Sequence, residues 1–194
     1  MIYTKYTINE IENKLEKCLT KERYLHSIGV MEMAVELAKK YKLNEDMAQI
    51  AGLLHDCAKC LDKEELKKYE YCLNECERDS LKTWHAPIGA IIAKNEYGVD
   101  KEDILSAIRW HTIGKVGMSN FEKIIFIADK IEHRTREDDM RIKIEQALNK
   151  RNCLDDAMLE SFKITINSLL DRNLPICFQT IEVYNSLIKQ EKES

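Results

Sequence analysis

The apolar residues of this chain recur with the period of an α-helix along almost its whole length. Apolar residues that return every three or four positions form a stripe on one helix face, whereas a half-buried strand alternates apolar and polar residues. The alternating pattern is nearly absent, and the 194 residues include only six Gly and two Pro, which disfavours a loop-rich β-sandwich. The sequence therefore predicts an all-α fold.

Start and stop signals divide this pattern into separate helices. The expected helices cover residues 7–19, 20–41, 44–56, 63–73, 87–97, 101–111, 121–134, 140–150, 154–171 and 177–189. The expected N-terminal caps are Thr20, Asn44 and Asp100, with the capping boxes Asp62-x-x-Glu65 and Ser119-x-x-Glu122. No repeat or low-complexity linker interrupts the series. Residues 1–194 are expected to form a single helical bundle with its core from about residue 15 to residue 190.

The bulk composition disfavours several classes of protein. A net charge of −4 and a pI near 5.8 argue against a general nucleic-acid binder, because they supply no global basic field. The apolar run "IIFIA" is far shorter than a membrane span, and the first residues lack the pattern of a secretory signal. The seven cysteines are expected to be reduced thiols, so we expect a cytoplasmic protein that binds neither nucleic acid nor membrane.

The histidines are the most informative residues for function. Four of the five lie in, or at the end of, different expected helices: His26, His55, His85 and His111. Asp56 follows His55 directly, and Asp129 interrupts the most apolar helix, "IIFIADKI". A buried carboxylate costs several kcal/mol unless a partner compensates its charge. Metal coordination is one such partner, and imidazole with carboxylate suits iron, manganese or zinc.

Each of these residues also has a simpler explanation when it is taken alone. A single His on a helix face is usually a satisfied core or surface residue, and Asp129 can pair with the adjacent Lys130. Adjacent helical residues point about 100° apart. His55 and Asp56 can therefore share an ion only if the helix ends there or the ion sits above its end, and Cys57 to Lys59 favour such an ending. Spacing alone leaves the metal site and the simpler explanation open.

The arrangement resembles the HD-domain metal-dependent phosphohydrolases, an all-α superfamily. Its signature is a His on one helix, a His-Asp pair on the next and a distant Asp, which His26, His55-Asp56 and Asp129 match in order. Within the superfamily, the chain is most similar to the bacterial symmetrical diadenosine tetraphosphate hydrolases. The resemblance extends over roughly residues 15–190 and includes "RYLHSIGV", "AGLLHDCAK", "HAPIGA", "IRWHTIGKVGMS", "IADKIE" and "TIEVYNSLI".

The resemblance implies roles for individual residues. It makes His26, His55, Asp56 and Asp129 the ligands of a first metal, most typically iron, with manganese or zinc as alternatives. It places His85 and His111 where they bind a second metal or hold phosphate. Catalysis is assigned to Asp56 and Lys59, and substrate binding to Lys59, Thr112 and Arg136. Where the family has Pro and then Arg, this chain has "IEHRTRED", so Arg134 competes with Arg136 for that role.

The implied reaction is metal-assisted hydrolysis of a phosphoanhydride bond. The expected substrate is a dinucleoside polyphosphate of the diadenosine tetraphosphate type, cleaved symmetrically to two ADP by a metal-activated water. Two alternatives stay open, namely another HD-type nucleotide phosphohydrolase (a nucleotidase or an alarmone hydrolase) and a non-catalytic nucleotide- or metal-binding regulatory module. A homodimer is an open alternative to a monomer.

The cysteines suggest a competing metal site. Cys57-x-x-Cys60 and Cys72-x-x-x-Cys76 together could form a four-Cys zinc site. The second pair lies in an expected amphipathic helix rather than in Gly-rich turns, and a thioredoxin-like motif would need a βαβ context that is missing. We therefore expect free cysteines on apolar helix faces, with oxidation of Cys57 as a possible influence on the neighbouring Asp56.

Overall fold

The computed structural model describes residues 3–151 and 153–193, and these residues form helices and no strand. The α-helices are α1 (Ile8–Cys18), α2 (Lys21–Lys40), α3 (Glu45–Leu54), α4 (Lys63–Lys67), α5 (Glu75–Arg78), α6 (His85–Asn95), α7 (Glu102–Trp110), α8 (Asn120–Ile131), α9 (Asp138–Arg151), α10 (Leu154–Asp171) and α11 (Phe178–Glu193). Three short 3₁₀ helices are η1 (Cys57–Cys60), η2 (Glu70–Cys72) and η3 (Leu81–Thr83). The prediction of an all-α fold is confirmed.

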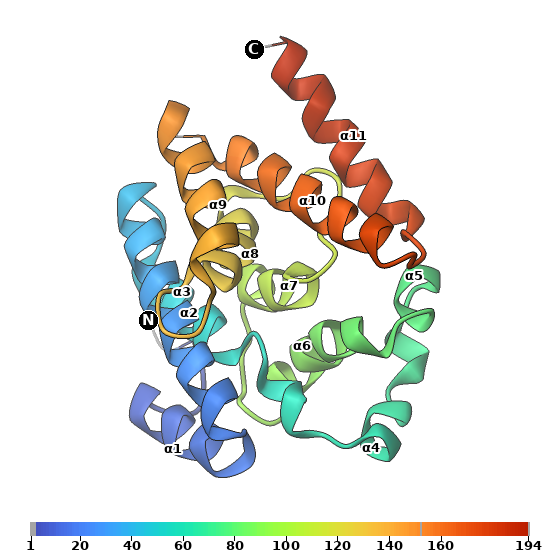
Figure 1. The fold of residues 1–194 in the computed structure, drawn as a ribbon. Helices are drawn as coiled ribbons and strands as arrows, with labels where there is room; N and C mark the ends of the chain where they lie inside the picture. The colour runs from blue at the N-terminus through green and yellow to red at the C-terminus, as the bar shows by residue number, and fades with distance from the viewer. Residues whose placement is uncertain (1–2, 152, 194) are drawn as a thin grey trace.

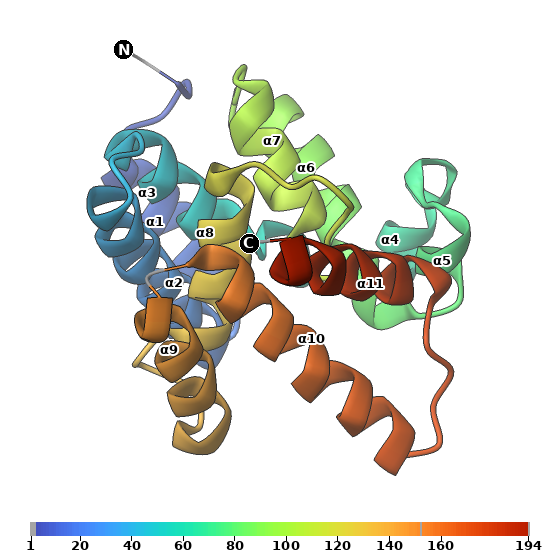
Figure 2. The ribbon, with the colours of Figure 1, turned by 90° about the horizontal axis from the view of Figure 1, so that it is seen from above.

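Helix α8 lies at the centre of this arrangement. Figures 1 and 2 show it surrounded by α2, α3, α7, α9 and α10, all of which contact it. Nine of its twelve residues are buried, which is typical of a helix that is covered on several faces. The stacked rings of Phe126 on α8 and Phe162 on α10 lie 5.4 Å apart between their centroids and join these two helices. The buried positions of α8 include two carboxylates, Glu122 and Asp129, which are therefore held inside the core.

Several predicted helix starts are confirmed by their hydrogen bonds. Thr20 and Asn44 accept a backbone N–H in the first turns of α2 and α3. Asp62-x-x-Glu65 and Ser119-x-x-Glu122 both form complete capping boxes. These caps depend on residues three positions apart, so the local sequence was sufficient to find them.

Other boundaries differ from the predictions. Asp100 is not a cap, because α7 begins one residue later than expected and Lys101 takes the capping position without a side-chain bond. The expected helix over residues 63–73 is divided into α4 and η2, and α4 buries no side chain that would favour its extension. Helix α8 ends at Ile131 rather than at Arg134, because Glu132 leaves the helical conformation with a ψ of 145°.

The prediction of seven reduced thiols is wrong for two cysteines. Cys76 on α5 and Cys177 before α11 form a disulfide across 101 residues of sequence. This pairing also removes Cys76 from the suggested four-Cys zinc site. Residues 172–177 thus lead from α10 to α5, where α11 begins (Figure 2). The sulfur of Cys57 is buried and donates to the carbonyl of Gly89, and burial raises its pKa, so the thiolate needed for oxidation is disfavoured.

Within the described residues, no helix is both long enough and apolar enough to cross a membrane. The predicted single domain of residues 1–194 includes residues 1, 2, 152 and 194, which lie outside the described part of the chain. One continuous cluster of buried apolar side chains runs from Tyr3 to Leu187 among the described residues. The division into one domain stays a prediction that this cluster favours.

Gly52 allows α3 to approach α2 closely. A Cβ at Gly52 would lie 2.8 Å from Met31 Cα and 3.0 Å from the Val30 carbonyl oxygen, which are backbone atoms that cannot rotate away. We expect Gly52→Ala to lower the free energy of unfolding by about 1–3 kcal/mol through overpacking. Circular dichroism should show this as a loss of about 2–4 °C in Tm for each kcal/mol.

Gly89→Ala is the matched control, because it is also a buried helical glycine. A Cβ at Gly89 would meet its neighbours at 3.5 Å or more, which is ordinary van der Waals contact. Both substitutions gain the same helix propensity. Equal Tm values for the two variants would contradict the close packing of α2 against α3.

Candidate metal centre

Six predicted site residues come together between α2, α3, α6, α7 and α8. They are defined as the His–Asp cluster: His26, His55, Asp56, His85, His111 and Asp129. All six are buried, with at most 7% of any residue exposed. His26 and Asp129 stand on α2 and α8, whereas the other four lie at helix ends. The structure thus places in one site residues that are as far as 103 positions apart.

The end of α3 allows two consecutive residues to face the same centre. The helix stops at Leu54, His55 forms its C-cap, and Asp56 leaves the helical region with φ −105° and ψ 15°. His55 Nε2 and Asp56 Oδ2 lie 3.7 Å apart. The helix therefore ends where it must for two adjacent residues, His55 and Asp56, to face the same ion.

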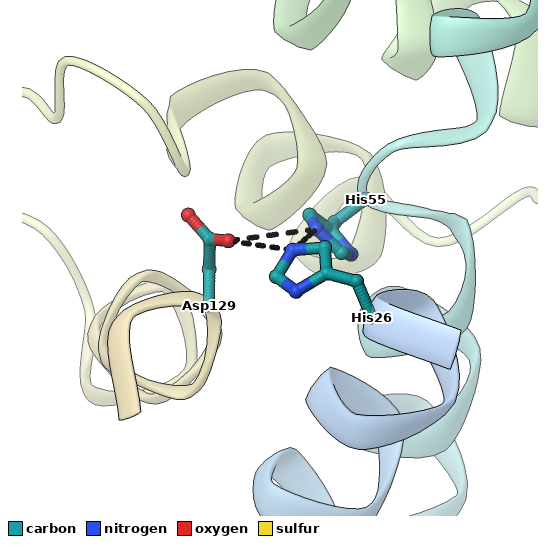
Figure 3. Close-up of side chains that lie close together, drawn as sticks. All are labelled: His26, His55 and Asp129. Carbon is teal, nitrogen blue, oxygen red and sulfur yellow. Dashed lines mark hydrogen bonds and ion pairs between the residues drawn. The ribbon is translucent and has the colours of Figure 1, made fainter. Parts of the chain in front are cut away.

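The first half of the His–Asp cluster consists of His26, His55 and Asp129, which are drawn in Figure 3. Asp129 Oδ1 lies 3.0 Å from His26 Nε2 and 3.8 Å from His55 Nε2. The two Nε2 atoms are 3.3 Å apart. Three potential ligand atoms from three helices thus converge on one point.

Asp56 joins this half to a second one formed with His85 and His111. Its Oδ1 atom lies 3.1 Å from His85 Nε2 and 3.6 Å from His111 Nε2, and these two nitrogens are 3.2 Å apart. Its other oxygen faces His55. His55, Asp56 and His111 also qualify as a group that could hold an ion. The Asp56 carboxylate thus presents one oxygen to each half of the cluster.

Two of the histidines are held in the tautomer that ligation needs. The Nδ1 atoms of His55 and His111 lie 2.7 Å from the carbonyl oxygens of Gly52 and Ile108, respectively, each three residues earlier. A carbonyl oxygen only accepts hydrogen bonds, so Nδ1 carries the proton and the Nε2 lone pair points into the cluster. These carbonyls belong to the last helical turn, where they have no partner within the helix. Converging lone pairs repel one another unless a cation lies between them, so these residues fit a metal ion.

The charges of the cluster also suit a cation. Burial lowers the pKa of His55 to about 3 and that of His85 to about 4, so both imidazoles are neutral at pH 7. Burial alone would raise the pKa of Asp56, but His55, His111 and His85 hold it well below its ordinary value. Asp129 is likewise kept ionised against burial by Lys130, Arg136 and His26. Neutral imidazoles with ionised carboxylates are a typical ligand set for iron, manganese or zinc.

Cationic side chains surround the two carboxylates. Arg23 Nη1 lies 3.1 Å from Asp56 Oδ2, and both Lys130 and Arg136 bind Asp129. Arg136 also donates through Nε to the Asp129 carbonyl at 2.6 Å. Arg134 turns away and forms a bidentate pair with Glu32 at 2.7 and 2.8 Å on the surface. Of the two competing arginines, only Arg136 faces the cluster.

The predicted substrate-binding residues Lys59 and Thr112 lie at the edge of the cluster. Lys59 on η1 is half-buried; burial lowers its pKa, and the charges of Asp56 and Asp129 act on it in the opposite direction. Thr112 follows His111 directly, and its buried hydroxyl has no hydrogen-bond partner among the described residues. Lys115 is engaged elsewhere, in an ion pair with Glu122. His133 is exposed and contacts Glu145 on α9.

Sequence reasoning missed Arg23 and Glu132. Arg23 precedes His26 by three positions, so it shares a face of α2 with a predicted ligand, and this spacing was a usable signal. Glu132 follows Asp129 by three positions and contacts His26 Nδ1 at 3.1 Å. The helix was expected to continue to residue 134, so this spacing from Asp129 was also a usable signal.

The fold and the site define a class of protein: an all-α protein with a buried cluster of imidazoles and carboxylates fit for metal. A model of the HD domain matches residues 23–134, a segment that contains all six residues of the His–Asp cluster. The chain belongs to the HD domain family. This agrees with the resemblance drawn from the sequence.

Several bacterial proteins are similar to this chain over most of their length. The chain is 39% identical to a protein of Bacillus subtilis named symmetrical bis(5'-nucleosyl)-tetraphosphatase, with 88% of this chain and 91% of the relative covered. A protein of the same name from Staphylococcus aureus is 34% identical, with 92% and 93% covered. A crystal structure from Clostridium acetobutylicum, described as a predicted HD superfamily hydrolase involved in NAD metabolism, is 38% identical. It superposes with a TM-score of 0.84 over 95% of this chain and 98% of that one.

Asp56 is expected to be indispensable for metal binding, since its carboxylate has one oxygen toward each half of the cluster. Asp56→Ala should reduce the bound metal of the purified protein to the background level, as measured by elemental analysis. Asp79→Ala removes an exposed carboxylate at the end of α5 and serves as the control. A metal-replete Asp56→Ala protein would refute the assignment of the site.

Proposed function

We propose that this chain hydrolyses dinucleoside polyphosphates of the diadenosine tetraphosphate type, symmetrically, to two ADP. The observation that carries the proposal is the buried His–Asp cluster with cations at its edge, in a member of the HD domain family. It is supported by relatives that are 34–39% identical over nearly the whole chain and are named for this activity. The reaction is the cleavage of a phosphoanhydride bond by water.

His26, His55, Asp56 and Asp129 would hold a first metal ion, and His85 and His111 would hold a second ion or the phosphate. Iron is the proposed metal, with manganese or zinc as alternatives, because all three accept imidazole and carboxylate ligands. When bound, such an ion supplies Lewis-acid chemistry, lowering the pKa of water from about 16 toward 7 and polarising a phosphoryl oxygen.

The side chains around the cluster have complementary tasks. Asp56 stays ionised, so it can orient the attacking water and accept a hydrogen bond from it. Lys59 and Arg136 bring positive charge to a polyphosphate whose leaving group, ADP, develops negative charge during cleavage. The buried Thr112 hydroxyl can donate to a phosphate oxygen. Arg23, with 41% of its side chain exposed, can reach both Asp56 and an incoming anion.

The proposal predicts a specific product. Metal-loaded protein incubated with diadenosine tetraphosphate should release ADP alone, because attack at the middle of the chain leaves two equal halves. Anion-exchange chromatography separates ADP from the AMP and ATP that asymmetric cleavage would give. In ¹⁸O-enriched water, one of each two ADP molecules should gain one ¹⁸O atom.

A substrate panel separates the proposal from its alternatives. The panel includes a nucleoside monophosphate, a guanosine alarmone and NAD, the last because a similar solved structure is described as involved in NAD metabolism. If any of these compounds is hydrolysed faster than diadenosine tetraphosphate, that compound would replace it as the proposed substrate of this site. Protein that binds metal but hydrolyses none of them would instead be a regulatory binding module.

Arg136 and Arg134 form a matched pair for testing the phosphate-binding role. Arg136→Ala should lower kcat/KM for diadenosine tetraphosphate by about 100-fold, comparable to the loss of one charge-stabilising donor. Arg134→Ala should stay within about threefold of the parent protein, because an exposed salt bridge contributes at most about 1 kcal/mol. Metal content is measured for both variants, since Arg136 also contacts Asp129. Equal losses in the two variants would contradict the proposed role of Arg136.

A further inference from the structure

His26 differs from the two histidines whose tautomer is fixed by a helix end. It lies within the first turns of α2 (Lys21–Lys40), where each backbone carbonyl accepts a bond from four residues further along the helix. His55 and His111, in contrast, use the free carbonyls of a last turn. If His26 is to present Nε2 to the His–Asp cluster, its Nδ1 atom needs an acceptor from another part of the chain.

Glu132 supplies that acceptor. Its Oε1 atom lies 3.1 Å from His26 Nδ1, while Asp129 Oδ1 lies 3.0 Å from His26 Nε2. The imidazole is therefore held between two carboxylates, one at each ring nitrogen, and both come from α8 or the residue after it. Glu132 has no exposed surface. It contacts His26 but none of the other five residues of the His–Asp cluster through a hydrogen bond described for this structure.

The turn after α8 is built to hold this carboxylate in place. The backbone N–H of Arg134 donates to Oε2 at 2.6 Å, the N–H of Thr135 donates at 3.0 and 3.2 Å, and the Thr135 hydroxyl donates to Oε1. Burial alone would raise the pKa of Glu132, but the hydrogen bonds from Thr135, His26 and Arg134 hold it below its ordinary value. The carboxylate is thus surrounded by N–H and O–H donors, so it acts as a hydrogen-bond acceptor toward His26.

Gly29 provides the space for it on the other side. Gly29 follows His26 by three positions and so lies on the same face of α2. A Cβ at this position would overlap Glu132 Oε2 and would lie 3.0 Å from its carboxyl carbon. Because Gly29 has no side chain, the Glu132 carboxylate can lie directly against α2.

We propose that Glu132 is a positioning residue that fixes His26 with its proton on Nδ1 and its Nε2 lone pair toward the metal site. The inference rests on the proposed metal centre. A carboxylate behind a metal-binding histidine orients the ring and raises its basicity, and loss of such a group typically weakens metal binding by about 10–100-fold.

Glu132→Gln is the sharpest variant, because it keeps the size of the side chain. The amide oxygen is needed as acceptor for the N–H groups of Arg134 and Thr135, so the amide NH₂ group has to face His26. Nδ1 then becomes an acceptor and the proton moves to Nε2, the ligand atom. Gly29→Ala tests the same contact from α2 by displacing an unchanged carboxylate.

Two measurements test the inference. Nitrogen-15 NMR of the metal-free protein should show a proton on Nδ1 of His26 in the parent protein and an unprotonated Nδ1 in Glu132→Gln. Competition with a chelator for Mn²⁺ should show a Kd that is about 10–100-fold higher in Glu132→Gln and in Gly29→Ala. Glu122→Gln is the control, since Glu122 is a buried carboxylate on the same helix whose partners are Ser106, Lys115 and Ser119.

The outcomes separate this inference from the proposed function. A proton that stays on His26 Nδ1 in Glu132→Gln, or an unchanged Kd in both Glu132→Gln and Gly29→Ala, would overturn the role of Glu132. An equal loss in Glu122→Gln would also overturn it, because the effect would then reflect general destabilisation. A parent protein that binds no Mn²⁺, iron or zinc would refute the proposed centre itself, whereas one that binds metal without hydrolysing nucleotides would leave the inference intact.

Discussion

Two ionised carboxylates, Asp56 and Asp129, are buried in the middle of a helical core, and this constraint governs the rest of the structure. A buried charge without compensation costs several kcal/mol. Burial would raise the pKa of both groups, yet neighbouring imidazoles and cations hold both well below the ordinary value. The surrounding helices are placed so that their polar groups converge on these two side chains. The core therefore favours positive charge between these two carboxylates, and a metal ion is a compact group that would supply it.

Helix α8 links the buried carboxylates to the packing of the other helices. It carries Asp129, is followed by Glu132 and contacts five other helices, so the position of the carboxylate is set by apolar packing on several sides. The same packing fixes where His26 can lie, because α2 contacts α8 directly and bears Gly29 against Glu132. A methyl group added at Gly29 would displace Glu132 and would thereby disturb the orientation of the His26 imidazole. The packing of the core around α8 thus also sets the geometry of the site.

The sequence was informative where the physics is local. Helical periodicity predicted the fold class, and the caps at Thr20, Asn44, Asp62 and Ser119 were found because they involve residues three positions apart. The candidate ligands could be named from residue type and from the resemblance to the HD-domain proteins. Contacts between distant segments could not be found in this way. Glu132 and His26 are 106 residues apart, and Cys76 and Cys177 are 101 apart, so neither pair leaves a periodic trace in the sequence.

The helix ends explain how a site of this kind can be assembled from ordinary helices. His55 and His111 each occupy a C-cap and bind the carbonyl three residues earlier, so one hydrogen bond both satisfies an orphan carbonyl and selects the Nδ1–H tautomer. The carbonyl ends of α3 and α7 also carry the negative end of the helix dipole, which adds to the preference for a cation. His26, within α2, lacks this device and is held by a carboxylate from another element. The orientation of His55 and His111 therefore depends on local sequence alone, whereas His26, inside a helix, needs a group from another element, and in this chain that group is Glu132 at the end of α8.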